Sequence, residues 1–275
     1  MSLLKHVWRA PLSAQFGLLM ILLYVLVAVF APVLAPFGET QVVGDGFTPW
    51  GGQFLLGTDN LGRDMFSRLV YGARNTLGIA FLTTVLAFLL GGSCGLIAAI
   101  KGGWVDQGLS RVVDILMAIP QLIFALLILS VVGTTATSLV LVIALLDATR
   151  VFRLSRAVAM NVVVQDFVEA ARLRGEGLCW LVTREVLPNA AAPLIAEFGL
   201  RFCFVFLFIS ALSFLGLGIQ PPTADWGSMV RDNAVLITFG DISPLLPALA
   251  VALITVSVNF VVDWMLHKSS GLKEC

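Results

Sequence analysis

Five long stretches of this sequence contain no Asp, Glu, Lys or Arg, and this feature limits the possible folds more than any other. They cover residues 10–38, 75–100, 115–146, 202–224 and 242–262. A helix needs about 20 apolar residues to cross the hydrocarbon core of a membrane. Because every stretch is long enough, the sequence predicts an all-α, polytopic membrane protein.

The third stretch is too long for one crossing. The polar run 133–138 interrupts it and predicts a turn with a helix on each side, which makes six transmembrane helices. The fourth helix has only eight apolar residues, 139–146, before Asp147, so it must continue past Arg150 toward Arg153 to cross the membrane. The fifth helix is expected to begin before Arg201.

Four polar side chains therefore fall within predicted spans: Asp147, Arg150, Arg201 and Asn259. Charged groups at membrane depth are expensive and normally face the interior of the bundle or water. Two interpretations remain open for Asp147 and Arg150. They pair locally or lie at the membrane interface, or they take part directly in transport.

The charge content excludes several classes of protein. Only 12% of the 275 residues are charged and 59% are hydrophobic, whereas an ordinary soluble domain has about 25% charged residues. The 17 basic and 17 acidic residues cancel, so there is no basic excess that would indicate a nucleic-acid partner. Four cysteines without a CxxC spacing do not form a disulfide framework.

Six crossings place both ends of the chain on one side of the membrane. Twelve Lys and Arg then lie on the side of the termini, against four on the opposite side, namely Arg63, Arg68, Arg74 and Arg231. Because cytoplasmic loops carry the excess of basic residues, both termini are predicted to be cytoplasmic. The first apolar stretch is too long for a signal peptide, and two prolines crowd any cleavage site, so an uncleaved helix is expected.

Catalytic signals are missing from the sequence. It has only two His and no HExxH, GxSxG or Walker-type motif, so we predict no catalytic, cofactor-binding or metal-binding residues. If the chain takes part in active transport, the energy must come from an ion gradient or from another subunit.

Residues 166–188 form the longest polar segment between predicted spans. A first helix is predicted, with Asp166 as its cap, and Gly175 and Gly177 end it. A second helix is expected from about Leu178 until Pro188 stops it. One side of the first helix is expected to be apolar, with Phe167, Ala170, Ala171 and Leu173. The segment is either an interfacial loop on the lipid headgroups or a docking element.

This segment resembles the EAA motif of permease subunits of binding-protein-dependent ATP-binding-cassette importers. The matching residues are Glu169, Ala170, Ala171, Gly175, Leu187 and Pro188. Glu185 stands where the motif has an apolar residue. Either that contact is unimportant here, or a salt bridge replaces it.

Two further stretches narrow the resemblance. LGTDNLGRDMFSRLVYGAR at 56–74 and SFLGLGIQPPTADWG at 213–227 are similar to dipeptide, oligopeptide and nickel permeases, and to the second, C-type subunit of the pair. The similarity extends from about residue 12 to 264. The C-terminus departs, because the run 262–268 lacks the family's Gly-Asp-Gly-Leu-Arg-Asp pattern, which leaves a docking role of the tail in doubt.

Residues on the predicted outer side and in the second span have simpler interpretations. A helix starting near Asp64 is expected to lie at the outer interface, either as a structural anchor or in contact with a binding protein. Its membrane-facing stripe would consist of Met65, Phe66, Leu69 and Val70. The prolines in 220–226 are expected to stiffen an extended outer loop. Gly91, Gly92 and Gly95 predict close helix packing.

The resemblance implies a type I importer (MetI-like) permease fold in a bacterial inner membrane. We expect an N-terminal segment with the first helix and an interfacial region at 1–74, a permease core at 75–266, and a tail at 267–275. The implied partners are a second permease in a heterodimer, two ATPase subunits that bind ATP and Mg, a periplasmic solute-binding protein and the lipid bilayer, without nucleic acid.

The implied function is a non-catalytic subunit that forms half of the translocation pathway for a di- or oligopeptide. Nickel chelates or other small solutes remain alternatives. A second alternative is an ion-coupled transporter that uses Asp114, Asp147 or Asp263. A third is an intramembrane enzyme, which the missing catalytic constellations disfavour.

Overall fold

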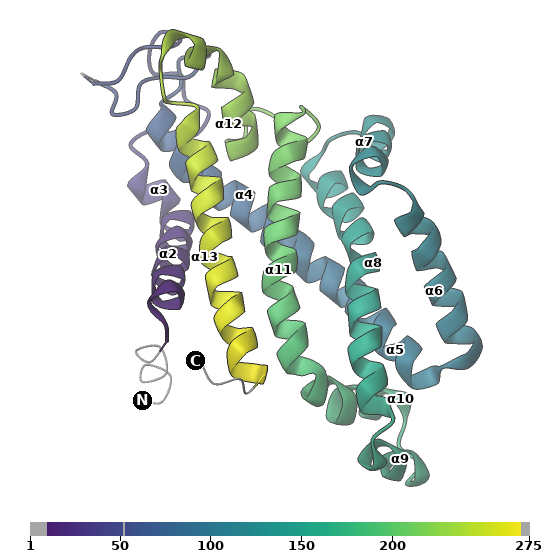
Figure 1. The fold of residues 1–275 in the computed structure, drawn as a ribbon. Coiled ribbons are helices and arrows are strands. Elements are labelled where there is room, and N and C mark those ends of the chain that lie inside the picture. Colours follow the sequence, from purple (N-terminus) through teal and green to yellow (C-terminus); the bar gives the residue numbers. More distant parts are fainter. Residues whose placement is uncertain (1–9, 52, 271–275) are drawn as a thin grey trace.

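A computed structural model describes residues 10–51 and 53–270, and helices dominate it (Figure 1). Within these residues the only β-pairing consists of three isolated bridges in the 42–64 region. The α-helices are α2 (Leu12–Val29), α3 (Ala31–Leu34), α4 (Met65–Ala87), α5 (Ser93–Lys101), α6 (Gly103–Ala118), α7 (Gln121–Val132), α8 (Ala136–Val163), α9 (Asp166–Leu173), α10 (Leu178–Trp180), α11 (Leu187–Phe214), α12 (Trp226–Asn233) and α13 (Leu245–Ser270). Two π-helical segments, η1 (Phe88–Gly92) and η2 (Leu181–Val186), and a 3-10 helix, η3 (Ala234–Phe239), complete them.

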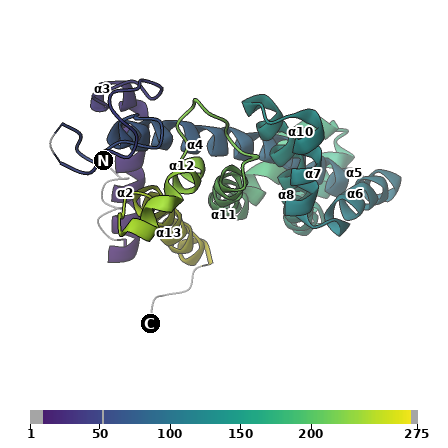
Figure 2. The ribbon, with the colours of Figure 1, turned by 90° about the horizontal axis from the view of Figure 1, so that it is seen from above.

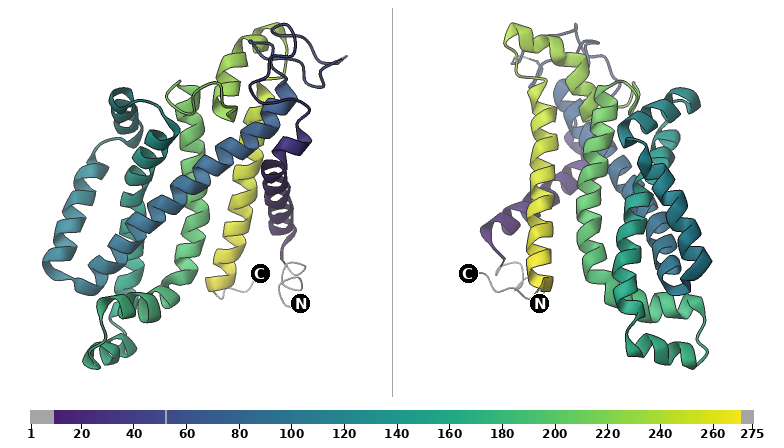
Figure 3. Two further views of the ribbon diagram at one scale, coloured as in Figure 1. Left: turned by 180° about the vertical axis from the view of Figure 1, so that it is seen from behind. Right: turned by 45° about the vertical axis from the view of Figure 1, so that its right-hand side comes forward.

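The long helices stand side by side in one flattened bundle. Helices α2, α13, α11 and α8 form a row, and α4 crosses this row diagonally (Figures 1 and 3). Seen from above, the elements spread along one direction (Figure 2). The two ends of the bundle along the helix axes differ (Figure 1). Helix α12 and the loops before α4 lie at one, which we call the α12 end. Helices α9 and α10 lie at the opposite one, which we call the α9 end.

Fewer helices pass a test of length and hydropathy for crossing a membrane than the six spans predicted. Four helical runs are long and apolar enough to cross a membrane, namely Leu12–Val29, Met65–Lys101, Leu178–Phe214 and Leu245–His267, and the pair α6–α7 is a fifth candidate. Helix α8 is the missing sixth. Its 28 residues extend about 42 Å, which is long enough, but four charged side chains at 147–156 lower its apolarity.

The third and fourth predicted spans are correct in part. The turn is confirmed, because α7 ends at Val132, Gly133 has a φ of +93°, and α8 begins at Ala136. Helix α8 also continues past Arg150 to Val163, as a crossing requires. The third span is not one straight helix. Helices α6 and α7 meet at an angle of 87°, and the bend lies at the two residues between them, Ile119 and Pro120.

The predicted interfacial helix near Asp64 is wrong as a separate element. Asp64 does start a helix, because its carboxylate accepts a hydrogen bond from the Ser67 N–H at 2.8 Å. This helix then continues without a break through residue 101, so it is the beginning of the second span. Met65 and Val70 of the supposed membrane-facing stripe are buried, because the α12 end packs over them. The boundary expected between residues 74 and 75 therefore falls inside a helix.

Glycines bring the second span close to α8, as predicted. A Cβ on Gly95 would lie 2.7 Å from the Phe152 carbonyl oxygen, and one on Gly91 would collide with the Ala148 carbonyl. Gly92 has more room. The approach of two helix backbones at small residues is the usual way to pack spans without a hydrophobic driving force.

Pro188 does not stop a helix, contrary to prediction. The helical run Leu178–Phe214 is continuous, and Pro188 lies in the first turn of α11, just after the π-helical turns of η2. The π-helical turns just before it depart from the regular α-helical hydrogen bonding, and such local adjustments let a helix accommodate a proline. At the C-terminal end, α13 continues to Ser270, so the boundary expected at 267 also falls in a helix. The basic residues Lys5 and Arg9 and the tail 271–275 lie outside the described residues.

Candidate functional site

The segment 166–188 projects at the α9 end of the bundle (Figure 1). Helix α9 follows α8 after two residues, and Gln165 occupies its N-cap position without a capping side-chain hydrogen bond. The prediction of Asp166 as the cap is therefore wrong, because Asp166 is already the first helical residue. Gly175 follows the C-terminal end of α9 and lies in the left-handed region with a φ of +82°, a conformation that favours glycine.

The buried face of α9 differs from the predicted one. Val168 and Ala171 are fully buried, whereas Phe167, Ala170 and Leu173 are exposed. Val168 and Ala171 are three residues apart and so lie on one side of the helix. They join an apolar cluster with Leu96, Ile100, Ala159, Leu181 and Val186. The larger side chains misled the sequence argument, although the i, i+3 spacing was a usable signal.

Two arginines stabilise the position of the segment: Arg172 bonds to α5, and Arg174 contacts two residues within the segment. The Arg172 guanidinium donates a hydrogen bond to the Ile100 carbonyl at 2.8 Å, which ties α9 to the end of α5. The Arg174 guanidinium lies 5.6 Å from the centre of the Trp180 ring and 3.9 Å from the Glu185 carboxylate. Of the two interpretations of Glu185, the structure supports the salt bridge. Neither arginine was singled out from the sequence.

The matching motif residues divide into one anchor and an exposed set. Ala171 is buried, and Glu169, Ala170, Gly175, Leu187 and Pro188 are exposed. We call these five exposed residues the α9-end surface. A Cβ on Gly175 would meet no atom within 4 Å, so this surface has room for a close approach.

A second group of predicted residues meets between α8 and α11. The Asp147 side chain is 2% exposed, and its Oδ1 lies 3.7 Å from Nη1 of Arg201. Arg201 also lies 2.7 Å from the Glu197 carboxylate and 4.7 Å from the centre of the Phe204 ring. Glu197 was not predicted, although its i, i+4 spacing to Arg201 was visible. Arg201 therefore contacts two carboxylates, Asp147 through Nη1 and Glu197 through Nε.

The other two predicted polar residues do not join this ion pair. Arg150 forms no ion pair within the described residues and is exposed, so it does not pair locally with Asp147. It lines a cavity of about 250 Å³ together with Gln121, Asp147 and Phe204. Asn259 donates to the Thr255 carbonyl of its own helix at 2.9 Å and lies near Cys203, away from the charged cluster.

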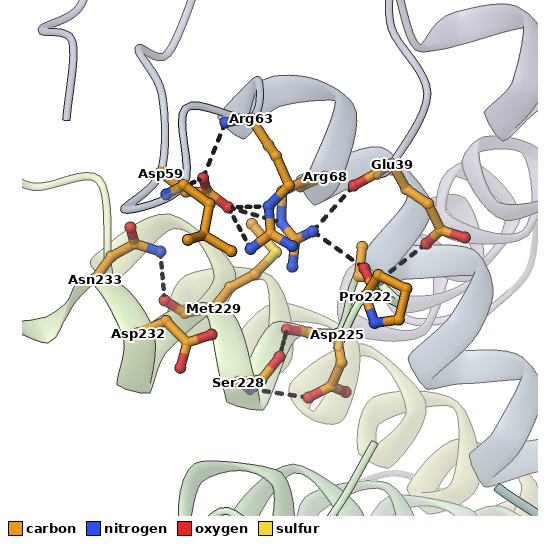
Figure 4. Close-up of polar contacts among 12 residues, drawn as sticks. Glu39, Asp59, Arg63, Arg68, Pro222, Asp225, Ser228, Met229, Asp232 and Asn233 are labelled. Atoms are coloured by element: carbon orange, nitrogen blue, oxygen red, sulfur yellow. Dashed lines mark hydrogen bonds and ion pairs between the residues drawn. The ribbon is translucent and has the colours of Figure 1, made fainter. Parts of the chain in front are cut away.

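A third cluster closes the α12 end (Figure 4). Asp59 accepts hydrogen bonds from the Leu61 and Arg63 backbone N–H groups at 2.9 Å and from the Arg63 Nε at 2.7 Å. Its Oδ2 also lies 3.3 Å from the Arg68 Nε. All three charged side chains of this cluster are at most 5% exposed. Arg68 further donates to the Glu39 carbonyl at 3.0 Å.

Glu39 and Asp225 extend this cluster to the loop before α12. The Glu39 carboxylate accepts from Asn75 at 2.8 Å and from the Ala224 N–H at 2.9 Å. Asp225 accepts from the Thr76 hydroxyl and the Ser228 N–H, both at 2.9 Å, and so caps α12. Burial raises the pKa of the Asp225 carboxyl. No motif or spacing in the sequence pointed to Glu39 as a member of this cluster.

We find no metal centre in the part of the chain that the structure describes, where no group of three or more His, Cys, Asp and Glu side chains is placed to hold an ion. The arrangement offers instead an exposed surface at one end, a buried polar cluster at the other, and charged residues on the spans between them.

Comparison with known proteins adds a family and a fold. Residues 91–269 match the family described as binding-protein-dependent transport system inner membrane component. The di/tripeptide transport system permease protein DppC of Pseudomonas aeruginosa is 38% identical over 272 residues, which is 95% of this chain and 90% of that protein. The dipeptide transport system permease protein DppC of Alkalihalophilus pseudofirmus is 33% identical over 91% of this chain and 83% of that protein.

A solved structure shares the fold. An inward-facing form of the MetNI methionine ABC transporter superposes with a TM-score of 0.55, covering 73% of this chain and 97% of that chain at 19% identity. The agreement extends over most of the helical bundle.

Proposed function

This chain belongs to the binding-protein-dependent transport system inner membrane components, and from that premise we propose which parts of it meet which partner. It acts as one permease subunit of an ATP-driven importer. A second, related permease forms the other half of the translocation pathway as a heterodimer. Two ATPase subunits bind ATP and Mg, and a periplasmic protein delivers the solute. The chain itself performs no catalysis.

The solute class follows from the relatives. The two permeases named above serve di- and tripeptide and dipeptide transport, and this chain aligns with them over more than nine-tenths of its length. We therefore propose a di- or oligopeptide as the solute. A nickel chelate or another small solute is the alternative for the same architecture.

The observation that carries the proposal is the α9-end surface. Glu169 and Ala170 of this surface lie on α9, which two buried side chains, Val168 and Ala171, and the Arg172 hydrogen bond hold in place. A partner that pushes on this surface moves α5, α8 and η2 through the same cluster. We assign this surface to ATPase docking and propose, with it, that the α9 end and both chain termini are cytoplasmic in a bacterial inner membrane.

The test is transport by the complete complex in proteoliposomes. Glu169→Lys and Gly175→Trp should each lower uptake strongly while ATP hydrolysis continues, because the motion of the ATPases no longer reaches the spans. Asp166→Lys is the matched control, since it makes the same charge reversal on an exposed residue of the same helix outside the motif. Uptake equal to wild type in either motif variant contradicts the docking assignment.

The ion-coupled alternative has its own test. It would use Asp114, Asp147 or Asp263, and Asp114 and Asp147 are paired with arginines. Uptake that persists with an ATPase-dead partner and collapses with the ion gradient would establish it. Uptake that needs an active ATPase and survives an ionophore supports the proposed importer.

A further inference from the structure

Arg150 stands out because it is a cation at mid-height of the bundle that forms no ion pair with any residue the structure describes. It is the fifteenth residue of α8, about 21 Å along the helix from Ala136. The other intramembrane cation, Arg201, is held by Asp147 and Glu197 at 3.7 and 2.7 Å. Among the described residues no carboxylate pairs with Arg150. A charged group at such a depth is costly and normally marks a water-filled path or a binding partner.

The surroundings of Arg150 have the composition of a small-molecule site. The 250 Å³ cavity between α7, α8 and α11 is lined by Gln121, Asp147, Arg150, Phe204, Val205 and Phe208. A second cavity of about 160 Å³ next to it shares Gln121 and Arg150. Apolar and aromatic walls with a few convergent polar groups are typical of ligand pockets.

The cavity is also incomplete. Pockets for small molecules usually enclose about 300–1,000 Å³, so this one is too small to surround a solute alone. In a permease pair, the facing subunit would supply the missing wall.

We propose, on the basis of the function proposed above, that this cavity is a station on the translocation pathway where Arg150 binds the carboxylate of the passing solute. A guanidinium binds a carboxylate through two parallel hydrogen bonds, and the Gln121 amide can donate another. Asp147 and Glu197 both contact Arg201, whereas Arg150 is the cation of the cavity lining that has no ion-pair partner among the described residues. The solutes it fits are small peptides with a free C-terminus.

The experiment measures uptake of a radiolabelled dipeptide and ATP hydrolysis by the complete complex in proteoliposomes. Arg150→Gln should lower uptake roughly tenfold or more, because it removes the charge and at least one of the two hydrogen bonds to the carboxylate in transit, while hydrolysis stimulated by the loaded binding protein stays near wild type. Arg150→Lys, which keeps the charge and loses the planar fork, should lie in between.

The matched control is Arg153→Gln, which lies one turn further along α8. Its guanidinium is paired with Asp114 at 2.6 Å and does not line this cavity. It should transport like wild type. Equal loss of uptake in both Gln variants would overturn the proposal, because the loss would then reflect the charge of α8 and not the cavity.

A chemical rescue separates solute binding from a structural role. In Arg150→Cys, a thiol reagent that adds an ammonium group should restore uptake, and one that adds a sulfonate should not, with the wild-type complex treated in parallel to account for its own cysteines. Rescue by both reagents, or uptake by Arg150→Gln within twofold of wild type, overturns the inference and leaves the proposed function intact. A wild-type complex that imports no dipeptide overturns the proposed function, and this inference with it.

Discussion

The two ends of the bundle hold their polar residues in opposite ways. At the α12 end, Asp59, Arg63 and Arg68 are buried, and their hydrogen bonds join segments far apart in the sequence, such as Arg68 to Glu39 and Thr76 to Asp225. At the α9 end, most motif residues are exposed, and the ion pairs of Arg174 reach only nearby residues.

The α12 end is therefore structurally fixed, whereas the α9 end exposes its polar residues to a partner. A buried charge that loses its partner is strongly destabilising, so the α12 end is held in one arrangement. Exposed pairs contribute little, so the α9 end keeps its shape through a small apolar cluster and leaves its polar surface for a partner.

The largest effect is expected at Asp59. Asp59→Ala leaves the buried Arg63 and Arg68 guanidinium groups without their carboxylate, and this should lower the free energy of unfolding by about 3–5 kcal/mol. Denaturant unfolding in detergent measures it. The comparison is Asp114→Asn, whose ion pair is 53% exposed on both sides and should contribute at most about 1 kcal/mol. Similar losses in the two variants would remove the contrast.

A smaller effect is expected from packing at Gly72. A Cβ there would lie 2.6 Å from the Trp226 ring, which is buried and fixed by a 2.9 Å hydrogen bond from Nε1 to the Leu69 carbonyl. Gly72→Ala should therefore destabilise the protein by about 1–3 kcal/mol. Gly78→Ala in the same helix has open space and should be neutral or slightly stabilising. Thermal unfolding of both variants checks the difference.

At the α9 end, Gly175 should have a local effect. Its φ of +82° makes alanine unfavourable by about 1–2 kcal/mol, and Gly175→Ala should loosen the end of α9 and lower uptake per ATP hydrolysed. Gly177 has an ordinary φ of −75°, so Gly177→Ala should behave like wild type. Amide exchange of residues 166–180 would show the loosening, whereas global unfolding should change little. Loss of global stability in Gly175→Ala would indicate that this end is as fixed as the other.

The smallest effect is the pH dependence that Asp225 contributes. Because burial raises its pKa in the folded protein, the folded state holds a proton that the unfolded state, with a pKa of about 4, has released. Stability should therefore fall as the pH rises from about 4 to the folded pKa and then level off. Asp225→Asn removes this slope and keeps the carbonyl that accepts from Thr76 or Ser228. An unchanged slope would show that another group causes it.

Much of the fold could be predicted because the local amino-acid composition marks the membrane-spanning helices. Uncharged stretches located the spans, and Gly133 marked the turn before α8. The failures have one cause: a local pattern says where a helix can begin or end but not what packs on it. Met65 looked lipid-facing until the α12 end covered it, and Pro188 looked like a stop until η2 joined α10 to α11.

The candidate site shows the same division. Motif spacing singled out Glu169 and Gly175 as candidates, and of these features the structure tests only the end of α9, which Gly175 does form. The partner of Asp147 and the cavity of Arg150 depend on how α8 sits against α7 and α11, which no local pattern records.

The order of residues along the chain already indicates that it crosses a membrane and that a polar segment carries an EAA-like motif. Which charges are buried together and which are left open depends on how the helices pack. Arg68 and Arg150 are the same residue type on similar helices, yet one is locked under the α12 end and the other faces a cavity. The energy of a charge depends on its surroundings, and folding sets those surroundings.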